Sequence, residues 1–252
     1  MVKAQTLKSS KHHPIFDGKF SERVAAGFSG RTHGNMSLYY GNTDEAFLNR
    51  QIFCAELGID CLRLVCAQQT HGHTIRRVSG ADAGRGSRSY DSSLADTDAL
   101  VANERNVPLA VFTADCLSVF LYSPETQSIG LVHAGWKSTA SQICAETLAR
   151  MKEEFGAAAE GIYAHFGPSI RTCCYEVGKE FREKFPSFIE ERGAKSFLDL
   201  AAANRAQLVS CGVKPSNISD YSICTCCNHE EFFSYRSEGQ SCGRMMSVIM
   251  LT

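Results

Sequence analysis

The sequence has no excess of charge of either sign, because 26 basic and 27 acidic residues give a formal net charge of −1. It therefore lacks both the basic surface of a nucleic-acid-binding protein and an acidic tail, which favours a neutral small molecule or a protein as the partner. The most apolar stretches, residues 117–122 and 248–251, are far shorter than the ~18 residues that span a membrane. No G-x-G-x-x-G or P-loop string is present, so nothing supports a nicotinamide or ATP cofactor.

A secretory signal and an internal linker are also missing. Residues 1–16 carry lysines and histidines but no apolar segment, so we expect a cytoplasmic protein with a mobile N-terminus over 1–16. The absence of a Pro-rich or Gly/Ser-rich linker, and of any repeat, predicts one domain over residues 1–252. The twelve cysteines are too few for a disulfide scaffold, and we interpret most of them as reduced, buried thiols.

Secondary structure is expected to be mixed. Apolar spacing and closing glycines predict helices at 44–57, 138–155, 176–185 and 198–211, and apolar or β-branched runs predict strands at 61–68, 73–78, 108–122, 127–133, 231–235 and 245–251. The run at 108–122 is rich in Val, Leu and Phe, as in a strand covered on both faces, and it is interrupted at residues 113–115 by Thr113 and Asp115. Residues 79–96 are expected to form a long surface loop. Because strands and helices alternate only in part, the predicted fold class is α+β, with mixed β-sheets and flanking helices.

Three residues that can bind a metal lie at or beside the ends of predicted strands: His71, Cys116 and His133. Two imidazoles and a thiolate suit zinc, and three protein ligands leave the fourth position for water or substrate. Their separations of 45 and 17 residues match no local metal motif, and each residue alone is compatible with a structural role. A cysteine hydrolase is also possible, with Cys116 as nucleophile, His133 as base and Asp115 or another acid as orienting group. A non-catalytic binding protein with a structural zinc is a third interpretation.

Five strings occur in a fixed order along the chain. They are QQTHG, TADC, HAGWKS, GPSIRTCCYEVG and FFSYRSE, at residues 68–72, 113–116, 133–138, 167–178 and 232–238. In this order they resemble the YfiH-like family, whose members are called laccase-domain or multicopper polyphenol oxidase proteins and, more recently, purine nucleoside phosphorylases. The match extends from about residues 27–41 to the C-terminus, and it implies the YfiH-like fold.

This resemblance also implies an activity and a site. The site is a mononuclear zinc centre on His71, Cys116 and His133, with Arg50 in the position of an active-site arginine. The implied reactions are phosphorolysis of inosine, adenosine, guanosine and methylthioadenosine, and deamination of adenosine, by a monomer or a homodimer. The polyphenol-oxidase label implies copper instead, but eight histidines are few for several copper sites, so we expect one metal site holding zinc.

Further residues receive roles from this chemistry. Water on zinc becomes acidic, which suits deamination, and Asp115 is either its proton shuttle or a side chain held by backbone donors. Arg50 and Lys137 are candidate phosphate ligands, although Arg50 could instead be a solvated helix residue. Lys137 and Ser138 replace the usual arginine and glycine of HAGWRG, and a lysine loses the bidentate fork of arginine. Tyr39 stands where many relatives have asparagine.

The cysteines near the C-terminus raise the question of a second metal. The string CTCCNH contains Cys224, Cys226, Cys227 and His229. We interpret it as C-x-C-C without the paired C-x-x-C geometry, and therefore expect an ordinary strand-to-loop junction. Cys173 and Cys174 are expected to be reduced structural thiols and not disulfide partners.

Overall fold

The apolar segments in the middle of the sequence form the centre of the molecule, which is described here from a computed structural model covering residues 22–252. The expected mobile N-terminus, residues 1–16, lies outside the described residues. A six-stranded sheet has the order β12-β8-β6-β7-β4-β3, with strands Ile218–Asp220, Tyr163–Phe166, Leu117–Ser123, Ser128–Ala134, Ala99–Ala102 and Ile75–Arg77. Its two longest strands, β6 and β7, pair antiparallel, with Ser118 opposite His133.

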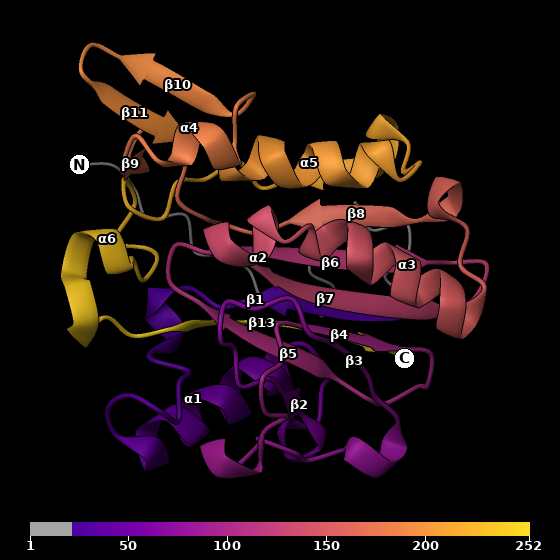
Figure 1. Cartoon of the computed structure of the whole chain (residues 1–252). Coiled ribbons are helices and arrows are strands. Elements are labelled where there is room, and N and C mark those ends of the chain that lie inside the picture. The colour runs from indigo at the N-terminus through magenta and orange to yellow at the C-terminus, as the bar shows by residue number, and fades with distance from the viewer. Residues whose placement is uncertain (1–21) are drawn as a thin grey trace.

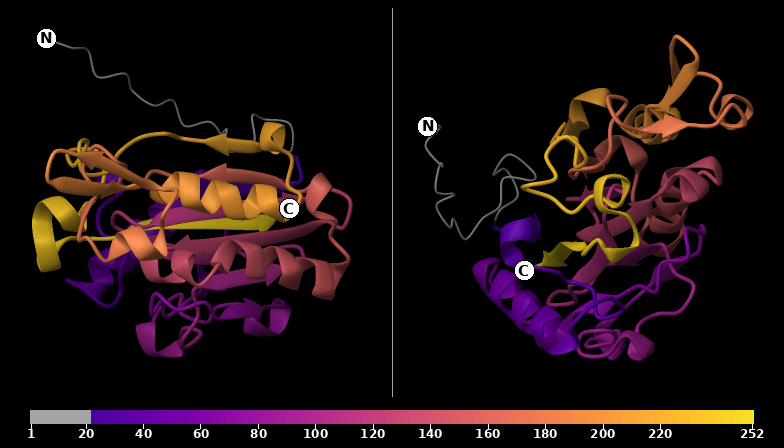
Figure 2. Two further views of the ribbon diagram at one scale, coloured as in Figure 1. Left: turned by 45° about the horizontal axis from the view of Figure 1, so that its top comes forward. Right: turned by 90° about the vertical axis from the view of Figure 1, so that its left-hand side faces the viewer.

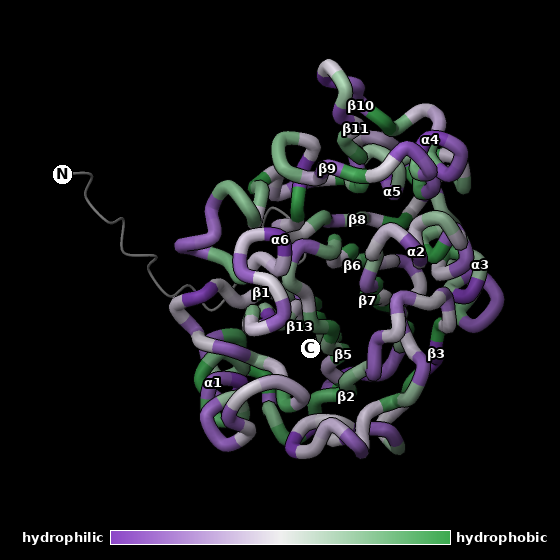
Figure 3. Tube along the Cα trace, turned by 60° about the vertical axis from the view of Figure 1, so that its left-hand side comes forward, coloured by the Kyte–Doolittle hydropathy of each residue, from purple (hydrophilic) through white to green (hydrophobic). Residues whose placement is uncertain are grey.

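A second sheet packs against the first. Its order is β1-β13-β5-β2, with strands Val24–Phe28, Met245–Leu251, Leu109–Thr113 and Val65–Cys66. Phe120 and Leu131 of the first sheet share one buried core with Leu109 and Ile249 of the second. The hydroxyl of Ser247 in β13 also donates to that of Ser118 in β6, at 2.9 Å. Hydrophobic residues accordingly run along the central strands, and polar residues along the outer loops (Figure 3).

Helices cover the two outer faces. Helix α1, Thr43–Glu56, buries Phe53 and Cys54 against the second sheet, and the Asn42 side chain caps its N-terminus. Helices α2 (Trp136–Ala140), α3 (Ile143–Phe155) and α5 (Leu200–Ser210) cover the first sheet, where Leu148 and Met151 join its core. The layers are therefore helix, sheet, sheet and helix (Figure 1). The predicted α+β class is confirmed.

The remaining elements lie along one edge of these layers. Strands β9 (Glu176–Val177), β10 (Ile189–Arg192) and β11 (Lys195–Leu198) form a small antiparallel sheet, and its β10–β11 hairpin projects from the body (Figure 2). Helices α4 (Phe181–Lys184) and α6 (Tyr235–Glu238) flank it. Short 3-10 turns occupy Arg31–His33, Cys61–Arg63, Gly80–Asp82, Tyr90–Ser92, Ala159–Gly161, Pro215–Asn217 and Gly239–Ser241. No helix in residues 22–252 is long and apolar enough to cross a membrane.

Several predicted elements are wrong in ways that matter for the site. The predicted strand 108–122 is two strands, β5 and β6, in different sheets, because Asp115 adopts φ 88° and breaks the extended run. The predicted helix 138–155 is also divided, at Gln142 (φ 60°). Residues 231–234 are not a strand, and the helix predicted at 176–185 is reduced to α4 after β9. Of residues 61–68 only Val65–Cys66 form a strand, and Ala67 adds an isolated bridge to Leu94.

Candidate metal centre

The three predicted metal ligands meet at one end of the two sheets. His71 follows β2, Cys116 lies between β5 and β6, and His133 is in β7. Their ligand atoms all lie within 4.8 Å of one another, and His71 Nε2 is 3.7 Å from Cys116 Sγ. The imidazole rings are edge to face, with centroids 4.8 Å apart. Long-range folding thus supplies the proximity that the sequence spacing does not encode.

Asp98, at the start of β4, orients these ligands. Its fully buried carboxylate accepts a 2.7 Å hydrogen bond from His133 Nδ1. The same carboxylate accepts backbone N–H groups from Thr70, His71 and Gly72, at 2.8 to 3.2 Å. These bonds hold His71 in the left-handed region, at φ 60°. Because Nδ1 of His133 is bound to Asp98, Nε2 is left for Cys116 or a metal, an arrangement typical of metal-binding histidines.

The electrostatics of the centre favour a thiolate. Burial opposes ionisation of Cys116, but His133 and His71 outweigh it and hold the pKa of this thiol below its ordinary value. Burial similarly opposes the charge on Asp98, yet hydrogen bonds from His133 and from backbone amides hold its pKa below the usual range. A thiolate is the form in which cysteine binds a metal.

The donor set fits a zinc ion. Two imidazole nitrogens and one cysteine sulfur converge, and the three residues line a common cleft. Held by these three ligands, a zinc ion would keep a fourth position for water or substrate. Gly135, just before α2, keeps the ligands in place because a Cβ there would lie 2.9 Å from His71 Cδ2 and 3.2 Å from Cys116 Sγ.

The cleft over this centre has a volume of about 920 Å³ and suits a small organic molecule. Among its lining residues, Tyr39 packs on Tyr90 with tilted rings whose centroids are 4.7 Å apart. Trp136 packs on Phe181, at 4.9 Å. Aromatic faces and titratable groups therefore line the same space.

Asp115 lines the cleft beside Cys116, and the tertiary fold anchors its carboxylate. Thr225 Oγ1 donates to Oδ1 at 2.7 Å, and the backbone N–H of Arg236 donates to Oδ2 at 2.6 Å. These partners lie 110 and 121 residues away in sequence. These contacts support the interpretation of Asp115 as a side chain held by donors, of which one is a backbone N–H and the other a hydroxyl. Proton transfer by Asp115 remains a prediction.

Arg50 is buried at the cleft wall, so its interpretation as a solvated helix residue is wrong. Its guanidinium donates to the carbonyls of Met36 (2.7 Å), Gly86 (2.8 Å) and Ser87 (3.2 Å). It also stacks on Phe112, with Cζ 4.5 Å from the ring centroid. Nη2 makes no hydrogen bond to the described residues.

Lys137 is not brought into the cleft. It is exposed, and its Nζ lies 5.6 Å from the centroid of the Trp136 ring. Its neighbour Ser138 is buried and accepts a hydrogen bond from Gly135 N at 2.9 Å. The serine therefore closes the turn that carries His133 into α2.

Sequence reasoning missed Asp98, Arg236 and Arg244, all of which lie at this site. Arg236 and Arg244 line the cleft. Arg236 also donates to the carbonyl oxygens of Cys174 (3.2 Å) and Glu176 (2.9 Å). Arg236 lies inside the string FFSYRSE, so that motif could have indicated it, whereas nothing in the string ADTDAL singles out Asp98.

Comparison with known proteins gives consistent results. A family described as "Multi-copper polyphenol oxidoreductase laccase" matches residues 20–252. The chain is 32% identical to purine nucleoside phosphorylase YlmD of Bacillus subtilis, with 91% of this chain and 89% of that protein covered. It is also 32% identical to adenosine deaminase RL5 from an unknown prokaryotic organism, with 85% and 86% covered.

Solved structures agree with this assignment. The Bacillus licheniformis hypothetical protein YfiH superposes with a TM-score of 0.88 at 32% identity, over 93% of this chain and 94% of that chain. YlmD from Geobacillus stearothermophilus gives 0.87 at 30% identity, over 95% and 94%. Because the family match covers nearly the whole chain and the fold is shared, the chain belongs to the multi-copper polyphenol oxidoreductase laccase family, that is, to the YfiH-like proteins.

Proposed function

We propose that this protein is a zinc-dependent enzyme that splits purine nucleosides with phosphate and also deaminates adenosine. The observation that carries the proposal is the convergence of His71, Cys116 and His133 in one cleft, with Asp98 orienting His133. The names of the relatives, purine nucleoside phosphorylase and adenosine deaminase, supply the substrate class. Inosine, adenosine, guanosine and methylthioadenosine are the proposed substrates.

The proposed roles follow from what each side chain can reach. His71, Cys116 and His133 hold the metal, and a bound zinc ion supplies Lewis acidity at the position that these residues leave open. The aromatic walls formed by Tyr39 and Trp136 offer faces on which a purine can stack.

The cations of the cleft are proposed to hold phosphate against the ribose C1′. Arg50 contributes Nη2, and Arg236 and Arg244 also line the cleft. In phosphorolysis a phosphate oxygen attacks C1′, and the glycosidic bond breaks with its electron pair leaving on the purine. Lys137, exposed and outside the cleft lining, has less support as a phosphate ligand than these arginines. Asp115 is proposed to carry the proton in deamination, since its anchored carboxylate lines the cleft.

The test is a product screen on zinc-loaded protein with a panel of nucleosides, with and without phosphate. We expect free base and the corresponding pentose 1-phosphate only when phosphate is present, and inosine from adenosine in its absence. Cys116→Ala is expected to lower the zinc content by one ion per chain and to abolish both reactions. The matched control is Cys211→Ser at an exposed cysteine outside the cleft lining, and it should leave both unchanged. Zinc-loaded protein that converts no nucleoside would refute the proposal.

The alternatives predict different observations. A cysteine hydrolase is favoured by the alignment of Cys116, His133 and Asp98, in which Asp98 and not Asp115 would orient the imidazole. A catalytic triad needs only one imidazole beside the Cys116 thiol. His71 Nε2 also lies 3.7 Å from Cys116 Sγ, and two imidazoles around one sulfur favour a metal site over a triad. A hydrolase would stay active in a chelator.

A copper oxidase would oxidise phenols, yet within residues 22–252 the candidate metal groups contain only two histidines. A purely structural zinc would need a fourth protein ligand, and within the described residues the group has three.

A further inference from the structure

A second group of metal-binding side chains lies outside the cleft lining. It is a four-cysteine cluster, formed by Cys173 and Cys174 before β9 and by Cys224 and Cys227 after β12. The four sulfur atoms all lie within 4.8 Å of one another. Cys227 Sγ is 3.4 Å from Cys173 Sγ and 3.3 Å from Cys174 Sγ.

These distances fit one tetrahedral metal ion. A zinc–sulfur bond of about 2.3 Å places the sulfurs of a tetrathiolate site about 3.8 Å apart, close to the observed separations. A disulfide would join only two of the four cysteines, whereas here Cys173 and Cys174 approach Cys227 together and Cys224 completes the group. All four are free thiols.

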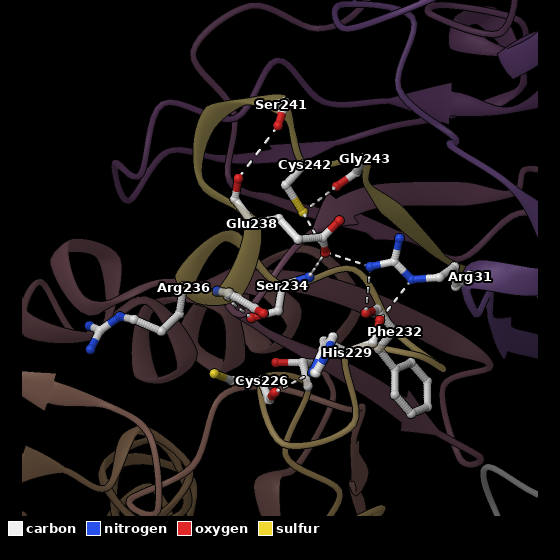
Figure 4. A network of polar contacts seen from close by, with 12 residues as sticks. Arg31, Cys226, His229, Phe232, Ser234, Arg236, Glu238, Ser241, Cys242 and Gly243 are labelled. Carbon is white, nitrogen blue, oxygen red and sulfur yellow. Dashed lines mark hydrogen bonds and ion pairs between the residues drawn. The ribbon is translucent and has the colours of Figure 1, made fainter.

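The second loop has the cysteine spacing of a metal-binding knuckle. Cys224 and Cys227 are in fact spaced as C-x-x-C, so the expectation of an ordinary junction rested on assigning the wrong members of CTCCNH. Cys224 of this pair is buried and Cys227 is exposed. His229 is not a member of the cluster, because its Nδ1 lies 3.3 Å from the carbonyl oxygen of Cys226 (Figure 4).

Backbone contacts fix the loop of Cys173 and Cys174 relative to the loop of Cys224 and Cys227. Ser169 pairs with Cys224 in a β-bridge, and its carbonyl accepts the backbone N–H of Thr225 at 3.1 Å. The carbonyl of Cys224 accepts Asn228 Nδ2 at 2.8 Å. The cysteines of the two loops therefore face each other without rearrangement of the backbone.

We propose that Cys173, Cys174, Cys224 and Cys227 bind a second, structural zinc ion. Four protein ligands leave no position for substrate, so this ion would join loops and take no part in chemistry. The first loop carries Tyr175, which lines the cleft, and the second carries Thr225, which holds Asp115. A zinc ion here would fix one wall of the cleft. This proposal is independent of the reaction assigned to the protein.

The first test is zinc stoichiometry, by elemental analysis and native mass spectrometry, of reduced full-length protein without an affinity tag. We expect two ions per chain in the natural sequence, one in Cys116→Ala and one in Cys224→Ser, with Cys211→Ser as the control that keeps both. A protein that binds one ion, and loses it entirely in Cys116→Ala, would overturn the proposal. This outcome does not affect the activity assigned to the cleft.

The second test needs no variant and so does not depend on how a cysteine mutant folds. Thiols are labelled with iodoacetamide before and after a chelator, and the modified peptides are identified by mass spectrometry. Exposed Cys173 and Cys227 should label far more slowly than exposed Cys211 until the chelator is added. Equal labelling of all three without the chelator, or an intact mass that reveals a disulfide among the four, would contradict the proposal.

Discussion

At the scale of single residues, the carboxylate of Asp98 determines the geometry of the candidate metal centre without being a ligand. It accepts three backbone N–H groups from residues 70–72 and the Nδ1–H of His133. One buried side chain thus fixes both the loop that carries His71 and the ring orientation of His133.

Asp98→Asn should weaken zinc binding by about 10- to 100-fold. The NH2 group of the asparagine is a hydrogen-bond donor, and it would face the backbone N–H groups and the His133 Nδ1–H, which are also donors. A competition titration of the purified variant with a chromophoric chelator measures this. Asp96→Asn is the matched control, since this nearby carboxylate accepts the Thr70 hydroxyl at 2.7 Å and bonds no metal ligand. Unchanged zinc affinity in Asp98→Asn would show that Asp98 does not orient the metal ligands.

Arg50→Ala should lower both stability and turnover while zinc stays bound. The substitution leaves the buried carbonyls of Met36, Gly86 and Ser87 without their donor, which costs about 2–4 kcal/mol of unfolding free energy. Urea unfolding, zinc analysis and nucleoside kinetics separate the effects. Arg88→Ala is the control, because Arg88 is exposed and stacks on Phe47, so we expect a loss below about 1 kcal/mol. Loss of zinc in Arg50→Ala, or full turnover, would contradict the role assigned to Arg50.

At the scale of elements, the junction between β7 and α2 is built around a close approach. Gly135 has an ordinary φ of −82°, so it is required there for space and not for backbone conformation. Helix α2 can begin at Trp136, close to the candidate ligands, only because Gly135 places no side chain between the helix and them.

Gly135→Ala should therefore abolish zinc binding at the cleft, since the added Cβ would lie 2.9 Å from His71 and 3.2 Å from Cys116. Elemental analysis of the variant should show one ion fewer per chain. Gly161→Ala provides a comparison, because its Cβ would meet only Glu125 Oε2, at 4.0 Å. A Gly135→Ala protein with a normal zinc content would show that the ligands can move aside.

The secondary structure shows how far local pattern predicts elements. The apolar strand 245–251 is β13 as predicted, and the glycine after residue 155 ends α3 at φ 72°. The break at Asp115 was not predicted, because an apolar run favours a continuous strand. Bonds from Thr225 and Arg236 hold Asp115 at the break, and they come from the far end of the chain.

At the scale of the whole molecule, residues from the two ends of the described chain are tied together. Arg31 forms an ion pair with Glu238 and donates to the carbonyls of His229 (2.7 Å) and Phe232 (3.3 Å) (Figure 4). This network holds the segment that follows the four-cysteine cluster and carries Arg236.

Glu238 should make stability depend on pH in the acid range. Burial opposes its charge, but Arg31 and the backbone N–H of Ser234 hold its pKa below the ordinary value. Its contribution is therefore complete above the unfolded pKa of about 4.3, and is lost as pH falls through the lower folded value. Glu238→Gln should cost up to about 1 kcal/mol at pH 7 and less at low pH, as measured by urea unfolding across pH.

Glu190→Gln is the matched control for this experiment. Glu190 pairs with Arg192 on the exposed β10–β11 hairpin, so the loss of this local pair should leave global unfolding unchanged. An equal cost of Glu238→Gln at pH 7 and at low pH would show that the Arg31 pair does not stabilise the fold through its charge.

The sequence by itself determined the family and the α+β class, because ordered motifs and apolar periodicity are local properties of the chain, and the family resemblance selected His71, Cys116 and His133 as candidate metal ligands. Only the tertiary structure decided that Asp98 orients the ligands and that Arg50 is buried while Lys137 is exposed. It also decided that cysteines 173 and 174 meet cysteines 224 and 227. These outcomes depend on which loops pack together at the ends of the two sheets. These contacts join segments 26 to 54 residues apart, and such contacts leave no periodic signal in the sequence between the segments.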